Sequence, residues 1–483
     1  MNNNPKRKIR RFKLAPPPLE LPVYGKVSPK KCSFFGRTNY EAALEEKKFI
    51  FGIKREDRRR HMYIIGKSGV GKSKSLELLI RQDIAYNRGL CVIDPHGDLV
   101  ADLLDFVPKE RIEDVVLIDP SDVQYPVSFN PLFNPEPELK YQLTQDLIEV
   151  MKKQFGANWG PRVEHVFRFT CLALLDYPNA TMRGMISMLT DRVYRQHVSE
   201  FIKDEMVRKF WAIEFADWSE KFDAEAIIPL VNKLTQFLAN PMIRNIFGQK
   251  DNKIDIEQLM NSEKIILINL AKGKLGEENA GFFGSIFLTK IKQAGMARAK
   301  MPEEERKDFY LYVDEFQNLA TESFENLLAE SRKFGFCLTL SHQYMRQLIP
   351  SIQSSVLGNV GTIVIFRVSG EDGVKLEPEM APVFKVDDMI NLGLRQFYIK
   401  MTIDGETYDP FSAETLKVLP PAYKSNKKEI IEQSRRKYAV SSKEAEKLMK
   451  EEEDKLSRSA EEKKMIEGDK KEKEEDQSAE PLV

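Results

Sequence analysis

Residues 61–79 carry the feature that most limits how this chain can fold. An apolar run, "MYII", precedes the octet "GKSGVGKS", and a helical pattern, "KSLELL", follows it directly. The octet matches G-x-x-x-x-G-K-[ST] at every position, and such a loop wraps its backbone N–H groups around phosphates at a helix N-terminus. Its members are Gly66, Lys67, Ser68, Gly69, Val70, Gly71, Lys72 and Ser73. The segment predicts an α/β domain that binds a nucleoside triphosphate.

Two side chains of this phosphate-binding loop (P-loop) have predicted roles of their own. Lys72 is expected to reach the β- and γ-phosphates, and the Ser73 hydroxyl to hold Mg²⁺. ATP and Mg²⁺ are therefore the expected cofactors. A glycine-rich turn with an exposed lysine is the alternative, and the strand before the loop and the helix after it count against that alternative.

A P-loop needs an acidic partner on another strand, and residues 308–316 supply one in "DFYLYVDEF". Asp314 would bind the Mg²⁺ shell, and Glu315 would orient and deprotonate the attacking water. A helix-capping aspartate is the alternative for Asp314. The second acid favours hydrolysis over transfer to a small substrate. We therefore predict an ATPase in which Lys72 and both acids converge across adjacent strands.

Two further polar residues lie close to the next strand pattern, "FCLTLSH". Gln343 follows that strand, which we place next to the Asp314 strand. A glutamine there can sense the γ-phosphate, although a polar loop residue is the simpler interpretation without other context. Arg332 precedes the strand and could stabilise transition-state charge in a neighbouring subunit. A surface arginine is an equally good interpretation of the sequence alone.

Three other residues have no role that the sequence decides. Asp94 and His96 follow "LCVI", and turn and helix-cap chemistry is the favoured interpretation, because one histidine without a second ligand cluster is weak evidence for a metal. Arg367 follows "IVIF" inside an apparent apolar strand. It could face phosphate, face another subunit or pair with an acid.

The order of strand and helix patterns predicts the domain organisation. Short β-branched runs alternate with helical patterns from residue 61 onward, as in a parallel sheet with crossover helices. Amphipathic helical patterns then replace the strands, and strand patterns resume near residue 264. The predicted divisions are a basic, proline-rich arm (1–45), the first part of the α/β domain (46–136), an all-α insertion (137–258), the second part of the α/β domain (259–422) and a charged tail, disordered or helical (423–483).

Composition restricts the class of protein. The 74 Lys and Arg residues balance 74 Asp and Glu residues, so DNA binding would depend on local basic clusters such as "KREDRRRH" and "LAKGKLGEEN". The four cysteines are far apart, which disfavours a disulfide framework and a zinc site. No apolar stretch is long enough to cross a bilayer. We expect a cytoplasmic protein that reaches the inner face of a membrane only through a partner.

Taken together, these segments resemble the HerA–FtsK superfamily of hexameric DNA-pumping ATPases, and most closely the type IV secretion coupling proteins of the TraD/TraG kind. The resemblance extends from about residue 61 to 370. The segments that carry it are "HMYIIGKSGVGKS", "VIDPHGDL", "VSFNPL", "LYVDEFQNLATESFENLLAESRKFGFCLTLSHQYMRQL" and "GNVGTIVIFR". The resemblance implies a RecA-like P-loop NTPase sheet with helices on both faces, interrupted by an all-α domain, in a subunit of a six-membered ring around DNA.

The resemblance also implies roles for individual residues. Lys72 and Ser73 would hold nucleotide and Mg²⁺, and Asp314 and Glu315 would form the second acidic motif. Gln343 would be the sensing glutamine and Arg332 the trans-acting arginine. Unlike the usual coupling protein, this sequence has no N-terminal transmembrane pair. Type IV secretion or relaxosome proteins are the partners that the resemblance suggests.

Three functional hypotheses follow. The leading one is an ATP-driven DNA translocase that contacts the DNA backbone with little sequence preference, because no base-reading module is visible. The second is a soluble HerA-like motor that processes DNA together with a nuclease. The third is a nucleotide-gated adaptor that does not translocate DNA.

Overall fold

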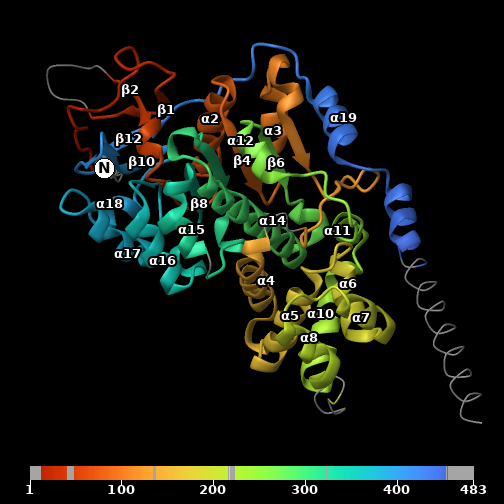
Figure 1. Cartoon of the computed structure of the whole chain (residues 1–483). Coiled ribbons are helices and arrows are strands. Elements are labelled where there is room, and N and C mark those ends of the chain that lie inside the picture. The colour runs from red at the N-terminus through yellow and green to blue at the C-terminus, as the bar shows by residue number, and fades with distance from the viewer. Residues whose placement is uncertain are drawn as a thin grey trace, which may run out of the picture. The chain divides into compact units, whose positions relative to one another are not determined.

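The protein is described here by a computed structural model of a chain that forms two compact units. Unit 1 comprises Met1–Asp119 and Asp255–Lys437, and unit 2 comprises Pro120–Ile254 and Tyr438–Val483 (Figure 1). The residues that the structure describes are 12–40, 48–133, 137–215, 217, 223–322, 324–452 and 454.

Unit 1 is built around a twelve-stranded sheet, whose central part is parallel. The parallel order is β9-β3-β8-β7-β4-β6-β5. These strands are β3 (Met62–Ile65), β4 (Gly89–Asp94), β5 (Val115–Ile118), β6 (Ile265–Asn269), β7 (Phe309–Val313), β8 (Phe336–His342) and β9 (Thr362–Ile365). Every residue of β3, β7 and β8 is buried, which is why their sequences are mostly apolar and do not alternate between apolar and charged residues.

An antiparallel extension continues the sheet beyond β9. Its order is β9-β10-β12-β1-β2, and a short strand, β11, pairs with β10. The bounds are β1 (Cys32–Thr38), β2 (Ile50–Lys54), β10 (Gln396–Ile403), β11 (Glu406–Thr407) and β12 (Phe411–Thr415).

The position of β1 corrects the expected N-terminal arm. Residues 32–38 were predicted as part of an arm reaching residue 45, but they pair with β12 and β2 inside the sheet. Phe35 is buried there against Phe51 and Phe397. The pairing partner in β12 lies more than 370 residues later in the chain, so no local pattern could indicate it. The basic start of the arm, residues 1–11, lies outside the described residues.

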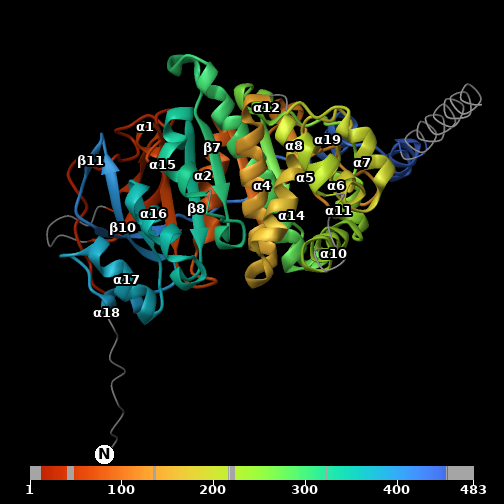
Figure 2. The same cartoon turned by 60° about the horizontal axis from the view of Figure 1, so that its bottom comes forward.

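Helices cover both faces of the sheet, which confirms the predicted fold class. On one face lie α2 (Lys72–Ala85), α3 (Asp98–Phe106) and α19 (Lys427–Tyr438), whose apolar residues share one core with the strands (Figure 1). On the other lie α14 (Glu277–Ala297), α15 (Phe324–Glu330) and α16 (Pro350–Asn359), and α15 and α16 come forward in Figure 2. Gly295 lets α14 approach the ring of Phe336, where a Cβ would lie only 1.9 Å from the ring. The shorter helices of unit 1 are α1 (Arg55–Arg58), α12 (Ile256–Asn261), α13 (Lys272–Leu275), α17 (Gly370–Met380) and α18 (Val386–Ile390).

Unit 2 is helical in its described part, apart from an isolated β-bridge between Val127 and Ala439. Its α-helices are α4 (Lys140–Phe155), α5 (Pro161–Leu174), α6 (Met182–Thr190), α7 (Arg192–Ser199), α8 (Glu205–Lys209), α10 (Ile228–Leu238) and α11 (Pro241–Phe247). Side-chain caps start several of them; Asp191, for example, accepts hydrogen bonds from the first turn of α7.

The residues after 422 are not all tail. Ile430 of α19 is fully buried in the core of unit 1, and Ala445 and Met449 are buried in unit 2. The Lys250–Glu452 ion pair also holds this part of the chain to unit 2. The predicted tail is thus helical in α19, one of the two predicted states, but residue 423 is wrong as its start, because apolar residues at helical spacing dock α19 and residues 445 and 449. Residues 453 and 455–483 lie outside the described residues.

The chain leaves unit 1 after β5 and returns just before α12, which leads into β6. Because β5 and β6 are neighbouring parallel strands, the first segment of unit 2, Pro120–Ile254, occupies one crossover connection of the sheet.

Candidate active site

The predicted site residues gather at the carboxyl edge of three parallel strands. The P-loop follows β3, the acids follow β7, and β8 lies between these two strands. Because β8 intervenes, the expectation that Lys72 and the acids meet across adjacent strands is wrong. β8 neighbours β7 as predicted, and it adds its own side chains to the same edge.

The P-loop is anchored to strands on both sides of β3. The Gly66 N–H donates to the His342 carbonyl at 3.4 Å, and the Lys67 N–H donates to the Arg367 carbonyl at 2.9 Å. Gly71 has a φ of 125°, which side chains rarely tolerate, and α2 begins at the next residue. The loop therefore presents its amides at the start of a helix, as phosphate binding requires.

Lys72 lies folded across its own loop. Its Nζ donates to the Gly66 carbonyl at 2.6 Å and to the Lys67 carbonyl at 3.2 Å. Burial lowers the pKa of Lys72, and the carboxylates of Glu315 and Asp314 oppose that shift. Lys72 is thus held in the P-loop, where its positive charge can neutralise phosphate and also interacts with Glu315 and Asp314.

Asp314 connects the acid strand to the P-loop helix. Its Oδ2 accepts a hydrogen bond from the Ser73 hydroxyl at 3.2 Å, and its Oδ1 accepts one from the Ser341 hydroxyl at 2.8 Å. Burial raises the pKa of Asp314, and Glu315 and Asp94 add to that shift, whereas Ser341 and Lys72 oppose it. Ser341 was not predicted, because a serine inside an apolar strand carries no distinctive sequence signal.

Ser73 and Asp314 fit a magnesium ion. Both offer hard oxygen ligands, and Mg²⁺ is usually held by one or two protein groups together with phosphate oxygens and water. Within the described ranges no group of three or more His, Cys, Asp or Glu side chains is arranged to hold a metal by itself.

A chain of hydrogen bonds joins the second acid to the P-loop. Gln343 donates from Nε2 to Oε1 of Glu315 at 2.7 Å, and Ser68 donates from Oγ to Oε1 of Gln343 at 2.9 Å. Gln317 donates to the other carboxylate oxygen of Glu315 at 2.7 Å. Glu315 itself has a left-handed backbone with a φ of 47°, a conformation that costs about 1–3 kcal/mol for a residue other than glycine. Two amides thus fix the direction of the predicted general base.

Arg332 stands apart from this cluster. It lies in the 3₁₀ turn Ser331–Phe334 and is exposed to solvent. The preceding Ser331 is buried, and its hydroxyl lies 3.2 Å from Nε2 of His61. Among the described residues, Arg332 has no hydrogen bond to the predicted site residues of its own chain. Exposure does not distinguish a trans-acting arginine from a surface arginine, so the role of Arg332 stays a prediction.

The undecided residues have structural roles. Asp94 accepts hydrogen bonds from the backbone N–H groups of His96 at 2.9 Å and Val100 at 3.0 Å, which confirms turn and helix-cap chemistry, and His96 is exposed. Arg367 does not lie within a strand, because β9 ends at Ile365. Its carbonyl anchors the P-loop at Lys67.

Comparison with known proteins identifies the family. Residues 51–379 match the model of the type IV secretion-system coupling protein DNA-binding domain. This chain belongs to the type IV secretion coupling proteins. No curated protein sequence matches it.

Solved structures of TrwB and VirB4 show the same fold. Unbound TrwBΔN70, a bacterial conjugative coupling protein, superposes with a TM-score of 0.57 at 13% identity, covering 77% of this chain and 89% of that one. TrwB in complex with ADP and Mg²⁺ gives 0.56 at 14% identity, covering 78% and 91%. VirB4 of Thermoanaerobacter pseudethanolicus gives 0.51 at 13% identity, covering 74% and 89%.

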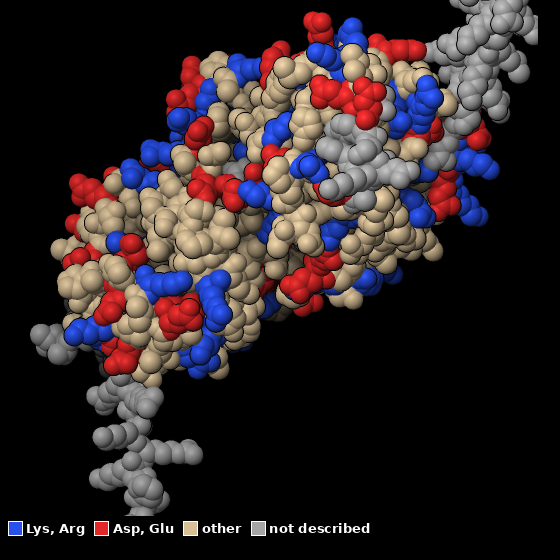
Figure 3. All heavy atoms as spheres, turned by 90° about the horizontal axis from the view of Figure 1, so that it is seen from below, with Lys and Arg blue, Asp and Glu red and all other residues tan. Residues whose placement is uncertain are grey.

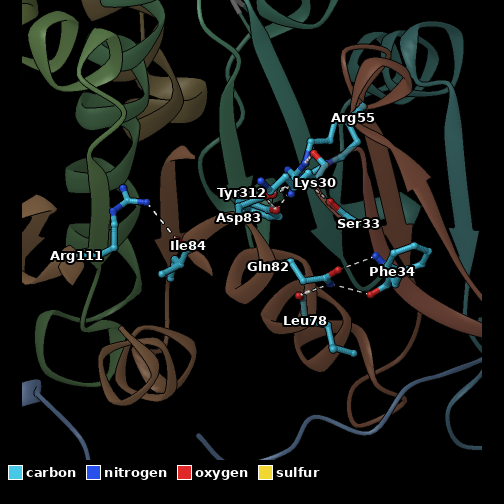
Figure 4. Close-up of polar contacts among 11 residues, drawn as sticks. Lys30, Ser33, Phe34, Arg55, Leu78, Gln82, Asp83, Ile84, Arg111 and Tyr312 are labelled. Atoms are coloured by element: carbon cyan, nitrogen blue, oxygen red, sulfur yellow. Dashed lines mark hydrogen bonds and ion pairs between the residues drawn. The ribbon is translucent and has the colours of Figure 1, made fainter. Parts of the chain in front are cut away.

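One predicted DNA-binding cluster of this coupling protein is largely internal. In "KREDRRRH", Arg55 and Arg58 are buried, and both form ion pairs with the buried carboxylate of Asp83. Figure 4 shows Arg55 next to Asp83. Arg59 pairs with Asp308 at 2.7 Å. The ion pairs of this run stabilise the fold. The prediction that the run contacts DNA is wrong for Arg55 and Arg58, because both side chains are buried.

On the face of the coupling protein that Figure 3 shows, Lys and Arg side chains are interspersed with Asp and Glu side chains. This face is therefore neither uniformly basic nor uniformly acidic. Lys274, in the other predicted cluster, is exposed on α13. None of the helices in the described part of the chain is both long and apolar enough to span a bilayer.

Proposed function

We propose that this coupling protein hydrolyses ATP with Mg²⁺ and uses the energy to move DNA through a ring of six subunits. The observation that carries the proposal is the hydrogen-bond chain from Ser68 through Gln343 to Glu315. The chain of hydrogen bonds links the P-loop, which would hold the phosphates, to Glu315, which would activate water. Gln343, directly after β8, contacts both. TrwB, a family member with the same fold, has been solved with ADP and Mg²⁺.

In this mechanism the chain's own residues divide the work. The P-loop amides and Lys72 would bind the phosphates, and Ser73 and Asp314 would hold the Mg²⁺, which supplies charge neutralisation when bound. Glu315 would accept a proton from the attacking water. Gln343, bonded to both Ser68 and Glu315, would report loss of the γ-phosphate. Arg332 of a neighbouring subunit would stabilise the transition-state charge.

The first prediction concerns Glu315→Gln. The substitution removes the proton acceptor but keeps the side chain's shape, so MgATP binding should be preserved while turnover falls by roughly 10²–10⁴-fold. Single- or double-stranded DNA should raise the turnover of the wild-type protein, and EDTA should abolish it. Binding is measured by calorimetry and turnover by phosphate release.

Glu429→Gln is the matched control, because it makes the same chemical change at an exposed residue of α19. It should leave both measurements unchanged. Turnover that no form of DNA raises would rule out translocation. Nucleotide binding without hydrolysis in the wild-type protein would instead favour a nucleotide-gated adaptor, and co-purification with a nuclease would favour a DNA-processing motor.

A further inference from the structure

Arg395 has an unusual backbone beside the P-loop. It immediately precedes β10 and has a φ of 64°, in the left-handed region that glycine and asparagine tolerate better than arginine. Strain of this kind persists only where the surroundings enforce it, and it often occurs at functional sites.

The backbone of Arg395 is fixed at both ends. Its N–H donates to the carbonyl of Val70 in the P-loop at 3.1 Å, and its carbonyl accepts a hydrogen bond from the N–H of Thr415 at 2.8 Å. A Cβ built on Gly71 would lie 3.9 Å from the Cα of Arg395, so the two segments are in contact. The side chain of Gln396 also holds the turn, because its Oε1 accepts from the Gly393 N–H at 2.8 Å.

The side chain of Arg395, unlike its backbone, forms no polar contact within the described part of the chain. It is exposed, and across the described part of the chain its guanidinium forms no hydrogen bond or ion pair. The fold requires at position 395 only a residue that tolerates a positive φ. The positive charge of Arg395 therefore has no structural role in the contacts described.

The sheet order indicates which part of a nucleotide this residue would meet. Seen from β3, the acids and Gln343 lie on the side of β8 and β7, whereas Arg395 lies on the opposite side, with β10 and β12. The γ-phosphate belongs to the side that carries Glu315 and Gln343. The opposite flank of the loop is left for the α-phosphate and the ribose.

We infer that Arg395 binds the α-phosphate–ribose end of the nucleotide held by its own P-loop. The guanidinium offers five N–H donors in a planar fork, which suits phosphate and hydroxyl oxygens. This inference rests on the proposed function, because it places a nucleotide in that loop. It adds a contact that di- and triphosphates share and that no hydrolytic step requires.

The test is the substitution Arg395→Asn, which removes the guanidinium but tolerates the left-handed backbone, so the thermal midpoint should be unchanged or higher. Affinity is measured by calorimetry for three probes: MgADP, a magnesium complex of a non-hydrolysable ATP analogue, and magnesium pyrophosphate. The Kd for both nucleotides should rise by about tenfold or more and by the same factor, as expected for loss of a charged hydrogen bond. The Kd for pyrophosphate should not change.

Lys375→Asn is the control, because it removes one exposed positive charge on α17, and the hydrogen bond of that side chain goes to Gln353 and not to the P-loop. It should leave all three affinities unchanged. Unchanged MgADP affinity in Arg395→Asn would overturn the inference, and so would an equal loss of pyrophosphate affinity. Wild-type protein that bound none of the three probes would overturn the proposed function itself, and this inference with it.

Discussion

His61 ties the P-loop strand to the turn that carries Arg332. The N–H of Leu338 donates to its Nδ1 at 3.2 Å, so the neutral ring carries its proton on Nε2 and donates it to the hydroxyl of Ser331. Protonation of Nδ1 would turn that acceptor into a donor and break the bond to Leu338. The ring therefore holds β8 and the Arg332 turn in place only while it is neutral.

Acid should weaken this connection. Burial lowers the pKa of His61 from 6.5 to about 4, and Arg332 adds to that shift. Between those two values the unfolded chain binds a proton that the folded chain does not. The contribution of His61 to stability is thus complete above pH 6.5 and is lost as the pH falls, by roughly 1.4 kcal/mol per pH unit.

The measurement is urea unfolding between pH 7 and 4. His61→Asn keeps an acceptor for Leu338 but does not titrate, so its stability should fall less steeply with pH than that of the wild-type protein. Some slope should remain from His342, whose pKa burial lowers to about 3. His96→Asn, at an exposed histidine, is the control and should keep the wild-type slope. Equal slopes in all three proteins would contradict the argument.

Residues whose signal is contiguous in sequence could be predicted, and the others could not. Lys72 and Ser73 belong to one octet, and Asp314 and Glu315 end one apolar run. Ser341 looks like any serine in a strand, and its role depends on an acid 27 residues away that β8 approaches only in the folded sheet. The roles assigned to Arg332 and Gln343 stay predictions.

The helix α2 links the P-loop to the interior of unit 1. Near its C-terminal end, Gln82 accepts from the N–H of Phe34 and donates to the carbonyl of Phe34, both at 2.7 Å, and so holds β1 (Figure 4). The next residue, Asp83, accepts hydrogen bonds from Arg55 at 2.7 Å, from Arg58 at 2.9 Å and from the hydroxyl of Tyr312. Tyr312 lies two residues before Asp314, so one helix contacts both the acid strand and the antiparallel extension.

Asp83→Asn should strongly destabilise the fold, because it leaves two buried guanidinium groups without their anion. Burial alone would lower the pKa of Arg58, but Asp83 more than offsets this, and the pKa lies well above its ordinary value. Removing one partner of a buried ion pair typically costs about 3–5 kcal/mol. Urea unfolding at neutral pH measures the loss.

Asp102→Asn is the control for Asp83→Asn. Asp102 pairs with Lys74 at the surface, with its side chain 46% exposed, and such pairs contribute less than about 1 kcal/mol. The control should unfold at nearly the wild-type urea concentration. Similar midpoints for the two variants would show that the Asp83 cluster does not stabilise the protein as its burial indicates.

At the level of elements, the sequence predicts the strands that are wholly buried. It misleads where a residue's partner lies far away in the chain. The apolar runs of β3, β7 and β8 gave the parallel core. The basic run at 54–60 suggested a DNA contact, because its partner Asp83 lies about 25 residues later and Tyr312 more than 250 residues later. Charge clustering in sequence does not distinguish an exposed patch from a set of buried pairs.

For the whole molecule, the proposed trans-acting role of Arg332 predicts that two inactive proteins restore each other. Glu315→Gln lacks the base, and Arg332→Ala lacks the exposed cation, so each alone should hydrolyse ATP very slowly. In a mixed ring, an Arg332→Ala subunit beside a Glu315→Gln subunit forms one complete site. With equal amounts and random assembly, about one quarter of the sites should be complete.

The measurement is ATP turnover of the mixture with DNA present, and retention of an untagged variant by its affinity-tagged partner establishes that the two variants co-assemble. A mixture of Arg332→Ala with Lys72→Ala provides a second pairing with the same expected recovery. Co-assembled mixtures that stay as inactive as their components would place Arg332 outside the catalytic site.

The point at which unit 2 is inserted has a consequence for how such a chain can change over time. Residues 120–254 interrupt the connection between β5 and β6, and none of the described residues of that segment belongs to a strand of the sheet. A crossover of this kind has a minimum length but no maximum, since each doubling of a loop adds only about 0.6 kcal/mol of closure entropy. The inserted helical segment can therefore be replaced, enlarged or lost while the strand register of the sheet in unit 1 stays the same.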